Sequence, residues 1–142
     1  MSTLSSGRGT EQEPDQPTVQ FSSAELTYLL GERRLGRLAT ADAAGQPHVV
    51  PVGWSYNPNL GSIDISGRNF AVTRKYRNAQ ANTRAAFVVD DVLPPFQPRC
   101  VTVQGIAQAL DAGQSGTEAM IRIVPTKITS WGLDDNPSAE SS

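Results

Sequence analysis

Two residue types that build many functional sites are nearly absent from this sequence, which contains one cysteine and one histidine among 142 residues. A single cysteine excludes an internal disulfide framework and is compatible with a reducing compartment. Cys100 and His48 alone cannot form a zinc site of the usual His/Cys type, so we expect no metal. Hydrolysis by a Ser-His-Asp triad is disfavoured, since no serine lies in a nucleophile-elbow context.

Long apolar runs are also absent. No apolar stretch approaches the roughly 18 residues of a membrane span, and the N-terminal region lacks the apolar segment of a secretory signal. A chain of 142 residues is long enough for one domain with a real core and too short for two. We therefore expect a single soluble, cytoplasmic domain that does not bind a membrane.

Both ends of the chain offer little to bury. Residues 1–20 are mostly Ser, Thr, Gly, Glu, Gln and Pro, and residues 134–142 are acidic and Ser-rich. Ordering such segments costs backbone entropy without apolar burial in return. We predict that both are disordered tails around one domain that spans residues 21–133.

Within this domain, apolar patterning predicts mostly β-structure. Six strands are expected, over Leu35–Ala41, Gln46–Tyr56, Gly61–Ser66, Ala85–Asp90, Arg99–Leu110 and Met120–Trp131. Ala85–Asp90 is apolar on both faces, as in a central strand covered on two sides. Because three prolines fall within Val92–Pro98, an irregular connection is expected there.

Two helices complete the expected fold. Ser22 and Glu25 have the pattern of a helix start, and this helix should run from Ser23 to about Arg33. A second helix is predicted over Phe70–Ala81 with Asn69 as its N-cap. Short strands joined by hairpins favour a closed barrel, since closure removes exposed sheet edges. The fold class is therefore β-rich α+β, a six-stranded barrel with two short helices.

The strand Gln46–Tyr56 contains a gap in its pairing and an open patch of backbone. Pro51 cannot donate to a strand ladder, and Gly53 has no side chain. A bulge or a sheet edge is one explanation, and a flat ligand laid against the strand is another. The sequence pattern alone leaves both open.

The net charge of −2 does not suggest a nucleic-acid-binding protein, but the basic residues are unevenly distributed. Between Asp64 and Asp90 there is no acidic residue, while five basic residues occur: Arg68, Arg74, Lys75, Arg77 and Arg84. The second predicted helix, which carries three of them, has three readings: a solvated helix face, a nucleic-acid contact or a phosphate site.

Phosphate binding is favoured by the residues around the start of this helix. Ser66 and Arg68 lie at a strand end, and Thr73 and Lys75 lie in the first helical turns. A hydroxyl, free helix amides and a cation would then converge on one anion. No dinucleotide-binding fingerprint accompanies them, since Gly67 stands alone.

Several segments, in order, resemble one known family. They are Arg37-Leu38-Ala39-Thr40, Gly45 to Gly53, Thr73 to Asn78, Arg84 to Asp91 and Ser130-Trp131-Gly132. They resemble the pyridoxamine-phosphate-oxidase-class flavin/deazaflavin oxidoreductases and, more narrowly, the branch that depends on coenzyme F420. The resemblance covers about Phe21 to Leu133, and the Gly-Gln-Pro and Arg-Asn segments are its most specific parts.

This resemblance implies a split β-barrel homodimer with the cofactor in a groove at the subunit interface. The residues expected along the cofactor ring are Val50, Pro51, Val52 and Gly53. The residues expected at its phosphate are Ser66, Arg68, Thr73 and Lys75, followed by Arg77 and Asn78. Some relatives have Arg where this chain has Thr73, so Arg68 or Arg74 must supply part of the positive charge.

The implied activity is hydride transfer from reduced F420 to an unsaturated organic substrate, with the cofactor supplying the chemistry. Two alternatives stay open: an FMN-dependent oxidase or reductase of the same fold, and a flavin- or deazaflavin-binding protein without turnover. No residue has the signature of a proton donor, and His48, Tyr56 and solvent remain open for that role. Neither a nucleic acid nor a membrane is expected as a partner.

Overall fold

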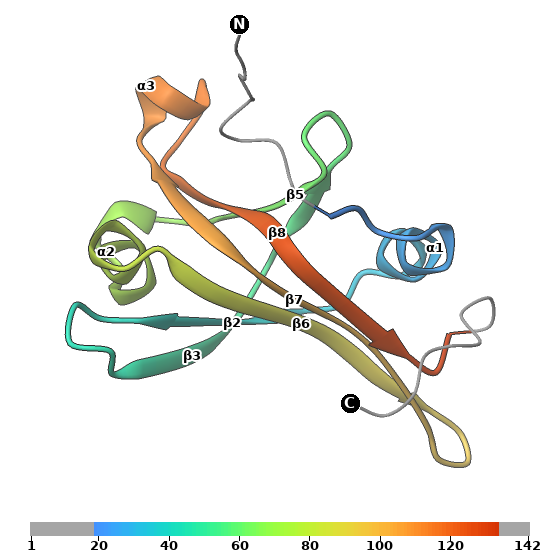
Figure 1. The fold of residues 1–142 in the computed structure, drawn as a ribbon. Coiled ribbons are helices and arrows are strands. Elements are labelled where there is room, and N and C mark those ends of the chain that lie inside the picture. The colour runs from blue at the N-terminus through green and yellow to red at the C-terminus, as the bar shows by residue number, and fades with distance from the viewer. Residues whose placement is uncertain (1–18, 134–142) are drawn as a thin grey trace, which may run out of the picture.

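The computed structural model describes residues 19–133. They form a strongly curled antiparallel sheet of seven strands in the order β3-β2-β6-β7-β8-β5-β4, with α1 and α2 at opposite ends (Figure 1). The elements are α1 (Ser23–Gly31), β2 (Gly36–Ala41), β3 (Pro47–Val52), β4 (Ser55–Asn57), β5 (Ser62–Ser66), a 3-10 helix η1 (Phe70–Val72), α2 (Arg74–Ala81), β6 (Arg84–Leu93), β7 (Gln97–Leu110), α3 (Ala112–Ser115) and β8 (Met120–Trp131). The predicted tails lie outside the described residues, apart from residues 19 and 20.

The β-rich fold class is confirmed, with seven strands instead of the six predicted. The predicted closure is wrong, because the sheet is curled but keeps two edge strands, β3 and β4. The expected strand Gln46–Tyr56 divides into β3 and β4 at Gly53 and Trp54. The indole Nε1 of Trp54 donates a hydrogen bond of 2.7 Å to the carbonyl oxygen of Arg34, and its ring packs edge-on against Phe87 at 5.6 Å. Because Trp54 is anchored to the core, the strand pairing is interrupted between Val52 and Ser55.

The first helix begins as predicted. The Ser22 hydroxyl accepts a hydrogen bond from the Glu25 amide at 3.1 Å, and the Glu25 carboxylate accepts one from the Ser22 amide at 2.8 Å. This reciprocal capping box satisfies two amides that the helix leaves without partners. The helix ends at Gly31, two residues earlier than expected.

The second helix differs from its prediction, and the assignment of Asn69 as its N-cap is wrong. Residues 70–72 form the 3-10 helix η1, and α2 starts only at Arg74. Thr73 is the N-cap of α2, because its side chain accepts a hydrogen bond from the Tyr76 amide. Its extended backbone, with ψ of 156°, separates the two helical turns. Asn69 has a left-handed backbone, φ 50°, and makes no side-chain cap.

Two further features of the sequence were misjudged. The predicted irregular connection over Val92–Pro98 is mostly strand, since β6 continues to Leu93 and β7 resumes at Gln97. The prolines at 94 and 95 sit in the turn, where no ladder amide is needed. Helix α3 was not predicted, although Asp111 and Gln114 form a capping box there.

The core lies inside the curl of the sheet and includes Leu38, Ile63, Phe87, Ile121 and Ile123, all at most 2% exposed. Burial of such side chains contributes about 1.5–3 kcal/mol each, so this inner face supplies most of the driving force for folding. In the described residues no helix is long and apolar enough to cross a membrane.

The segment Ser130-Trp131-Gly132 closes the end of β8 against the rest of the barrel. The Ser130 hydroxyl donates a buried hydrogen bond of 2.6 Å to the Glu25 carboxylate, which ties β8 to α1. Gly132 has φ of 80°, and a Cβ at this position would lie 2.2 Å from the carbonyl oxygen of Pro98. Only glycine fits this close approach.

The outer face of the sheet is less well covered than expected. The prediction that both faces of Ala85–Asp90 are covered holds only on the inner side, because Ala86 and Val88 are half-buried on the outer side. An open hollow of about 480 Å³ lies there, across β2, β6 and β7. Small or apolar residues, including Ala39, Ala86 and Ile106, line this outer hollow.

Candidate functional site

The first part of the predicted site is an edge strand. β3 stands at one end of the strand order, so it pairs on one side only, with β2. Val50 and Val52 pack toward the core, whereas Pro51 and Val49 are exposed on the opposite face. No atom lies within 4 Å of where a Cβ of Gly53 would be. The sheet-edge explanation for Pro51 therefore applies. Residues 50–53, which we call the β3 strip, have a flat, open surface.

The second part is the group Ser66, Arg68, Thr73 and Lys75, which we call the anion corner. Arg68 lines a hollow of about 560 Å³ that is formed by residues 67–72 together with Glu118 and Ala119. Within the described residues, Arg68 is exposed and makes no ion pair. Lys75 Nζ lies 5.2 Å from the ring centroid of Phe70, another residue of this hollow. Arg68 therefore borders the hollow directly, and Lys75 lies beside Phe70, one of its lining residues.

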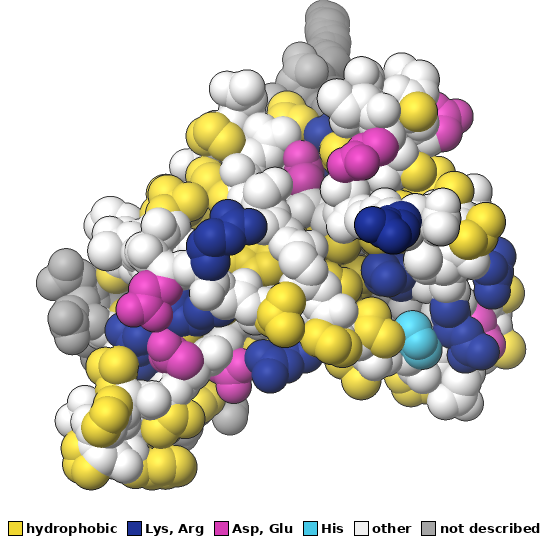
Figure 2. Space-filling model, turned by 180° about the vertical axis from the view of Figure 1, so that it is seen from behind, with side chains coloured by type: hydrophobic (Ala, Val, Ile, Leu, Met, Phe, Trp, Pro, Cys, Tyr) yellow, Lys and Arg dark blue, Asp and Glu magenta, His cyan; other side chains and the backbone are white. Residues whose placement is uncertain are grey.

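Dark blue Lys and Arg side chains gather on the side of the molecule that carries α2, at the right of Figure 2. This is the basic stretch recognised in the sequence. The charge is only partly available to a ligand, because Arg77 donates a hydrogen bond to the carbonyl oxygen of Val72. Asn78 is buried, and its amide donates a hydrogen bond of 3.1 Å to the Thr40 hydroxyl. Both residues thus fasten α2 to its neighbours, and their contact with a cofactor stays a prediction.

The two hydroxyl groups of the anion corner already have acceptors within the chain. Thr73 Oγ1 donates to the carbonyl oxygen of Phe70 at 2.7 Å while it caps α2. Ser66 Oγ donates to the Glu118 carboxylate at 2.7 Å. A hydroxyl has a single proton to donate, so each would have to leave its present acceptor to bind a phosphate oxygen. Glu118 was not recognised in the sequence, because it is 52 residues from Ser66.

The β3 strip and the anion corner border different hollows. The hollow at the anion corner contains no residue of β3, and Gly53 borders a different one, beside Trp54 and the end of α1. The predicted cofactor residues thus border two different hollows on a single chain.

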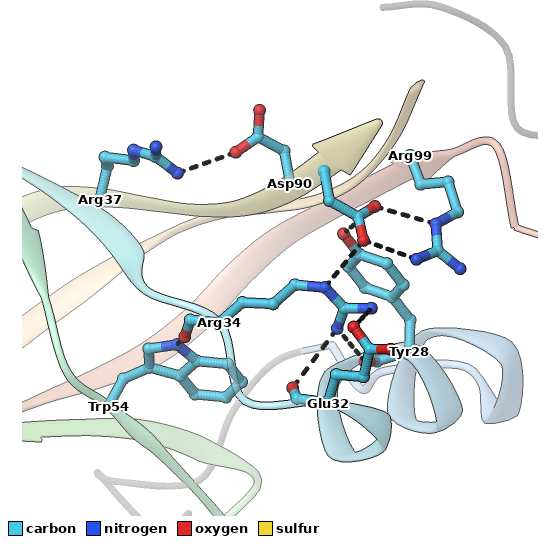
Figure 3. A network of polar contacts seen from close by, with 8 residues as sticks. Tyr28, Glu32, Arg34, Arg37, Trp54, Asp90 and Arg99 are labelled. Atoms are coloured by element: carbon cyan, nitrogen blue, oxygen red, sulfur yellow. Dashed lines mark hydrogen bonds and ion pairs between the residues drawn. The ribbon is translucent and has the colours of Figure 1, made fainter. Parts of the chain in front are cut away.

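A third polar group was missed in the sequence analysis and is shown in Figure 3. Asp91 accepts hydrogen bonds from Tyr28 at 3.1 Å, from Arg34 at 3.0 Å and from Arg99 at 2.9 and 2.6 Å. The guanidinium groups of Arg34 and Arg99 also lie 4.1 and 4.9 Å from the Tyr28 ring centroid. These residues come from α1, the loop after it, β6 and β7, so no local pattern reveals them.

This group, which we call the Asp91 network, shifts the pKa values of its members. The hydrogen bond from Arg99 is the main cause that lowers the pKa of Asp91 to about 2. Burial raises the pKa of Tyr28 well above its ordinary value. Since the charges of Arg34 and Arg99 are balanced by Asp91 and Glu32, the adjoining hollow of about 690 Å³ has little net charge to attract an ion. A structural role fits this network best.

The two side chains left open as proton donors have different surroundings. The ring of Tyr56 packs edge-on against Phe21 at 5.7 Å. His48 faces the same side of the sheet as Thr40, and its Nδ1 is buried without a hydrogen-bond partner among residues 19–133.

A curled antiparallel sheet with an open edge strand and a basic corner at a helix start is the arrangement of a split β-barrel that binds a cofactor of the flavin type. The pyridoxamine 5'-phosphate oxidase family matches residues 22–141 of this sequence. The chain therefore belongs to that family, and it is an oxidoreductase.

One curated relative is the 5a,11a-dehydrotetracycline/5a,11a-dehydrooxytetracycline reductase of Streptomyces rimosus. The two sequences are 42% identical over 127 residues, which cover 84% of this chain and 89% of the relative. Similar solved structures include an FAD-binding protein from Mycobacterium smegmatis, with a TM-score of 0.59, 23% identity and coverage of 80% and 97% of the two chains. Another is an F420 reductase, with a TM-score of 0.55, 19% identity and coverage of 72% and 94%. The two structures show the shared fold.

Proposed function

We propose that this protein is an F420-dependent reductase that transfers a hydride from the reduced deazaflavin to an unsaturated organic molecule. The observation that carries the proposal is the 42% identity, over most of both chains, with a reductase that acts on dehydrotetracyclines. The F420-type segments of the sequence and the fold shared with an F420 reductase support the choice of cofactor.

The residues present fit a group that combines a flat ring with a phosphate. Pro51 and Gly53 leave the β3 strip without bulky side chains, so a planar ring can approach the backbone closely. Arg68 and Lys75 provide two cations beside an open hollow. Two cations near a helix start suit a phosphate, whereas Ser66 and Thr73 would donate to it only after leaving the Glu118 carboxylate and the Phe70 carbonyl oxygen.

F420 supplies hydride chemistry when it is bound, and the protein supplies position and shielding. The β3 strip would orient the ring, with Val50 and Val52 holding the strand against the core. Lys75 and Arg68 would fix the phosphate and thereby the distance of the ring from the corner. An organic substrate would lie on the ring face that the protein leaves uncovered.

A homodimer is part of this proposal, because the β3 strip and the anion corner border different hollows of one chain. A groove between two copies can bring a β3 strip and a corner to the same cofactor. The half-buried outer face of β2, β6 and β7 offers a surface for such pairing. A cytoplasmic location agrees with the single cysteine, Cys100, which is buried and unpaired.

The alternative is an FMN-dependent oxidase or reductase of the same fold, which the fold shared with an FAD-binding protein favours. Purification from a host that makes flavins but no F420 separates the two. Under our proposal the protein is colourless, and F420 added afterwards binds more tightly than FMN in a fluorescence titration.

Reduction of an unsaturated organic acceptor is then measured with reduced F420 and, in parallel, with reduced FMN. A dehydrotetracycline is the first acceptor to test. A yellow protein that retains FMN and turns over with it, but not with F420, would establish the alternative. Binding of F420 without turnover on any unsaturated acceptor would instead indicate a cofactor carrier.

A further inference from the structure

One hollow beside the β3 strip has no role in the function proposed above. It is an open hollow of about 420 Å³ between the C-terminal end of α1 and β4, and we call it the α1 hollow. Gly53, the last residue of the β3 strip, forms part of its lining. In the described part of the chain, none of residues 50–53 lines the hollows at the anion corner, at the Asp91 network or on the outer face. The α1 hollow is therefore the one that adjoins the strip predicted to hold the cofactor ring.

Two leucines of the α1 hollow are exposed to water. Leu30 is 64% exposed in the last turn of α1, and Leu35 is 59% exposed just before β2. Their neighbours Leu29 and Leu38 are at most 3% exposed, so the core has room for leucines of this region but leaves these two outside. Exposed apolar side chains that gather on one hollow are typical of a binding surface.

Trp54 gives the α1 hollow a wall that is fixed before any ligand binds. Its indole Nε1 donates to the carbonyl oxygen of Arg34 at 2.7 Å, and its ring packs edge-on against Phe87 (Figure 3 shows the bond to Arg34). A Cβ at Gly36 would lie 2.3 Å from the Phe87 ring and 3.2 Å from the Trp54 ring, so only glycine lets both rings pack here. A preformed aromatic wall lowers the entropy cost of binding a flat molecule.

Three charged residues also line the α1 hollow. Glu32 and Arg34 lie 3.6 Å apart, and Arg34 bonds to Asp91 as well, so the charge of Arg34 is balanced. Arg33 is exposed and makes no ion pair among residues 19–133, which leaves its guanidinium able to donate to an oxygen of a ligand. The lining thus suits a molecule that is mostly apolar and carries an oxygen acceptor, and it disfavours a cation.

The reaction itself requires a binding surface next to the ring. A hydride passes between atoms that approach to about 3–3.5 Å, so the organic acceptor must lie directly on the cofactor ring. The part of the acceptor that does not react must then extend beyond the β3 strip. Gly53 has no atom within 4 Å of where its Cβ would be, so the way from the strip into the α1 hollow is open.

This inference rests on the function proposed above. We propose that the α1 hollow binds the body of the organic acceptor, a flat and mostly apolar ring system, and that Leu30 and Leu35 are its specificity-determining residues. They act by contact with the part of the acceptor that is not reduced. The affinity for F420 therefore does not depend on them.

The first test needs no cofactor. N-phenyl-1-naphthylamine, a neutral aromatic fluorophore, is titrated into the full-length protein, and its fluorescence reports binding. We expect Leu30→Gln and Leu35→Gln each to weaken binding about fivefold, because each removes apolar surface from the hollow. Val92→Gln is the matched control, since Val92 is 51% exposed in β6 and lines none of the hollows described above. It should bind the fluorophore as tightly as the wild type.

The second test follows the reaction. With the acceptor that the wild type reduces, Leu30→Gln and Leu35→Gln should each raise KM about fivefold and leave kcat nearly unchanged, since the lost contacts are made equally before and during hydride transfer. Both variants should bind F420 as tightly as the wild type. Circular dichroism should show the fold unchanged, because both leucines are exposed.

A wild type that does not bind the fluorophore would overturn the assignment, and so would Leu30→Gln and Leu35→Gln variants that bind it with wild-type affinity. An equal loss in Val92→Gln would overturn it too. If the two leucine variants turn a dimer into a monomer in light scattering, a second copy of the chain occupies the hollow and the assignment is wrong. A failure of the proposed function is distinct from all of these: the wild type would then neither bind nor use F420, while the two leucines would still govern binding of the fluorophore.

Discussion

At the scale of single residues, Lys75 and Arg68 carry the prediction that separates a phosphate site from a solvated helix face. If they hold the cofactor phosphate through charge-assisted hydrogen bonds, Lys75→Ala or Arg68→Ala should each weaken F420 binding by roughly 1.5 to 3 kcal/mol, about ten- to a hundredfold. The thermal midpoint should hardly change, because neither residue makes an ion pair among residues 19–133. A fluorescence titration with F420 gives the affinity.

Arg84→Ala is the matched control for these variants. Arg84 belongs to the same basic stretch but lies beyond the C-terminal end of α2, where its side chain is exposed. Because Arg84 also lines the outer hollow and pairs with Ile106, the Arg84→Ala variant serves as a control only while it stays dimeric in light scattering, and it should then bind F420 nearly as the wild type does. Wild-type affinity in both Lys75→Ala and Arg68→Ala would return the basic stretch to the reading of a solvated helix face.

The cations of the anion corner were predictable because they are close in sequence to a strand end and a helix start. The hydrogen bonds of the Ser66 and Thr73 hydroxyls were not predictable, since they depend on which acceptors lie nearby. Thr73 bonds to Phe70 within its own turn, and Ser66 bonds to Glu118, which is 52 residues away. Local sequence reveals residue types at a site but not how distant partners engage them.

At the scale of elements, the sequence predicts whatever depends on local periodicity and capping. The span of β8 and the start of α1 at Ser22 and Glu25 agree with the prediction, because alternation and a capping box are local signals. The division of Gln46–Tyr56 was missed because it depends on the contact of Trp54 with Arg34 and Phe87. A tertiary anchor here overrides the local strand pattern.

The Asp91 network joins three elements, and its removal should destabilise the fold. Asp91→Asn leaves the Arg34 guanidinium, whose side chain is 11% exposed, with only the exposed Glu32 carboxylate at 3.6 Å as a charged partner. We expect a loss of about 2 kcal/mol in the free energy of unfolding, measured by thermal or urea denaturation. Asp90→Asn is the control, because the neighbouring pair Arg37 and Asp90 is half exposed and should contribute little.

The loss should also depend on pH in a stated direction. The pKa of Asp91 is lowered from 3.8 to about 2 in the folded protein, so its stabilisation is fully present above about pH 4 and disappears as the pH falls through 2. The stability difference between the wild type and Asp91→Asn should therefore shrink as the pH is lowered from about 5 to 3. A difference that stays constant over this range would mean that the network owes its stability to packing instead of charge.

At the scale of the whole molecule, the prediction concerns assembly. Trp54 packs against Phe87 within the chain, while Pro51 and Phe96 are exposed. The outer hollow across β2, β6 and β7 is another surface with exposed apolar residues, and Ile106 is 42% exposed on it. A two-fold dimer with the same patch on both copies would cover it.

Light scattering should give about twice the chain mass of 15.2 kDa for the wild type. Ile106→Asp places a charge where the two outer faces would meet and should shift the protein to a monomer while circular dichroism stays unchanged. It should weaken F420 binding as well, since the cofactor groove needs a β3 strip and an anion corner from two copies.

Phe96→Asp is the comparison that locates the interface. Phe96 is 75% exposed at the tip of the β6–β7 hairpin, which projects at the lower left of Figure 2, away from the outer hollow in sequence and in strand position. If the outer faces pair, this variant stays dimeric and binds F420 normally. Loss of the dimer in Phe96→Asp, but not in Ile106→Asp, would place the interface at the hairpin. A wild-type monomer that binds F420 tightly would show that one chain holds the whole cofactor, and the two separate halves of the site would then need another explanation.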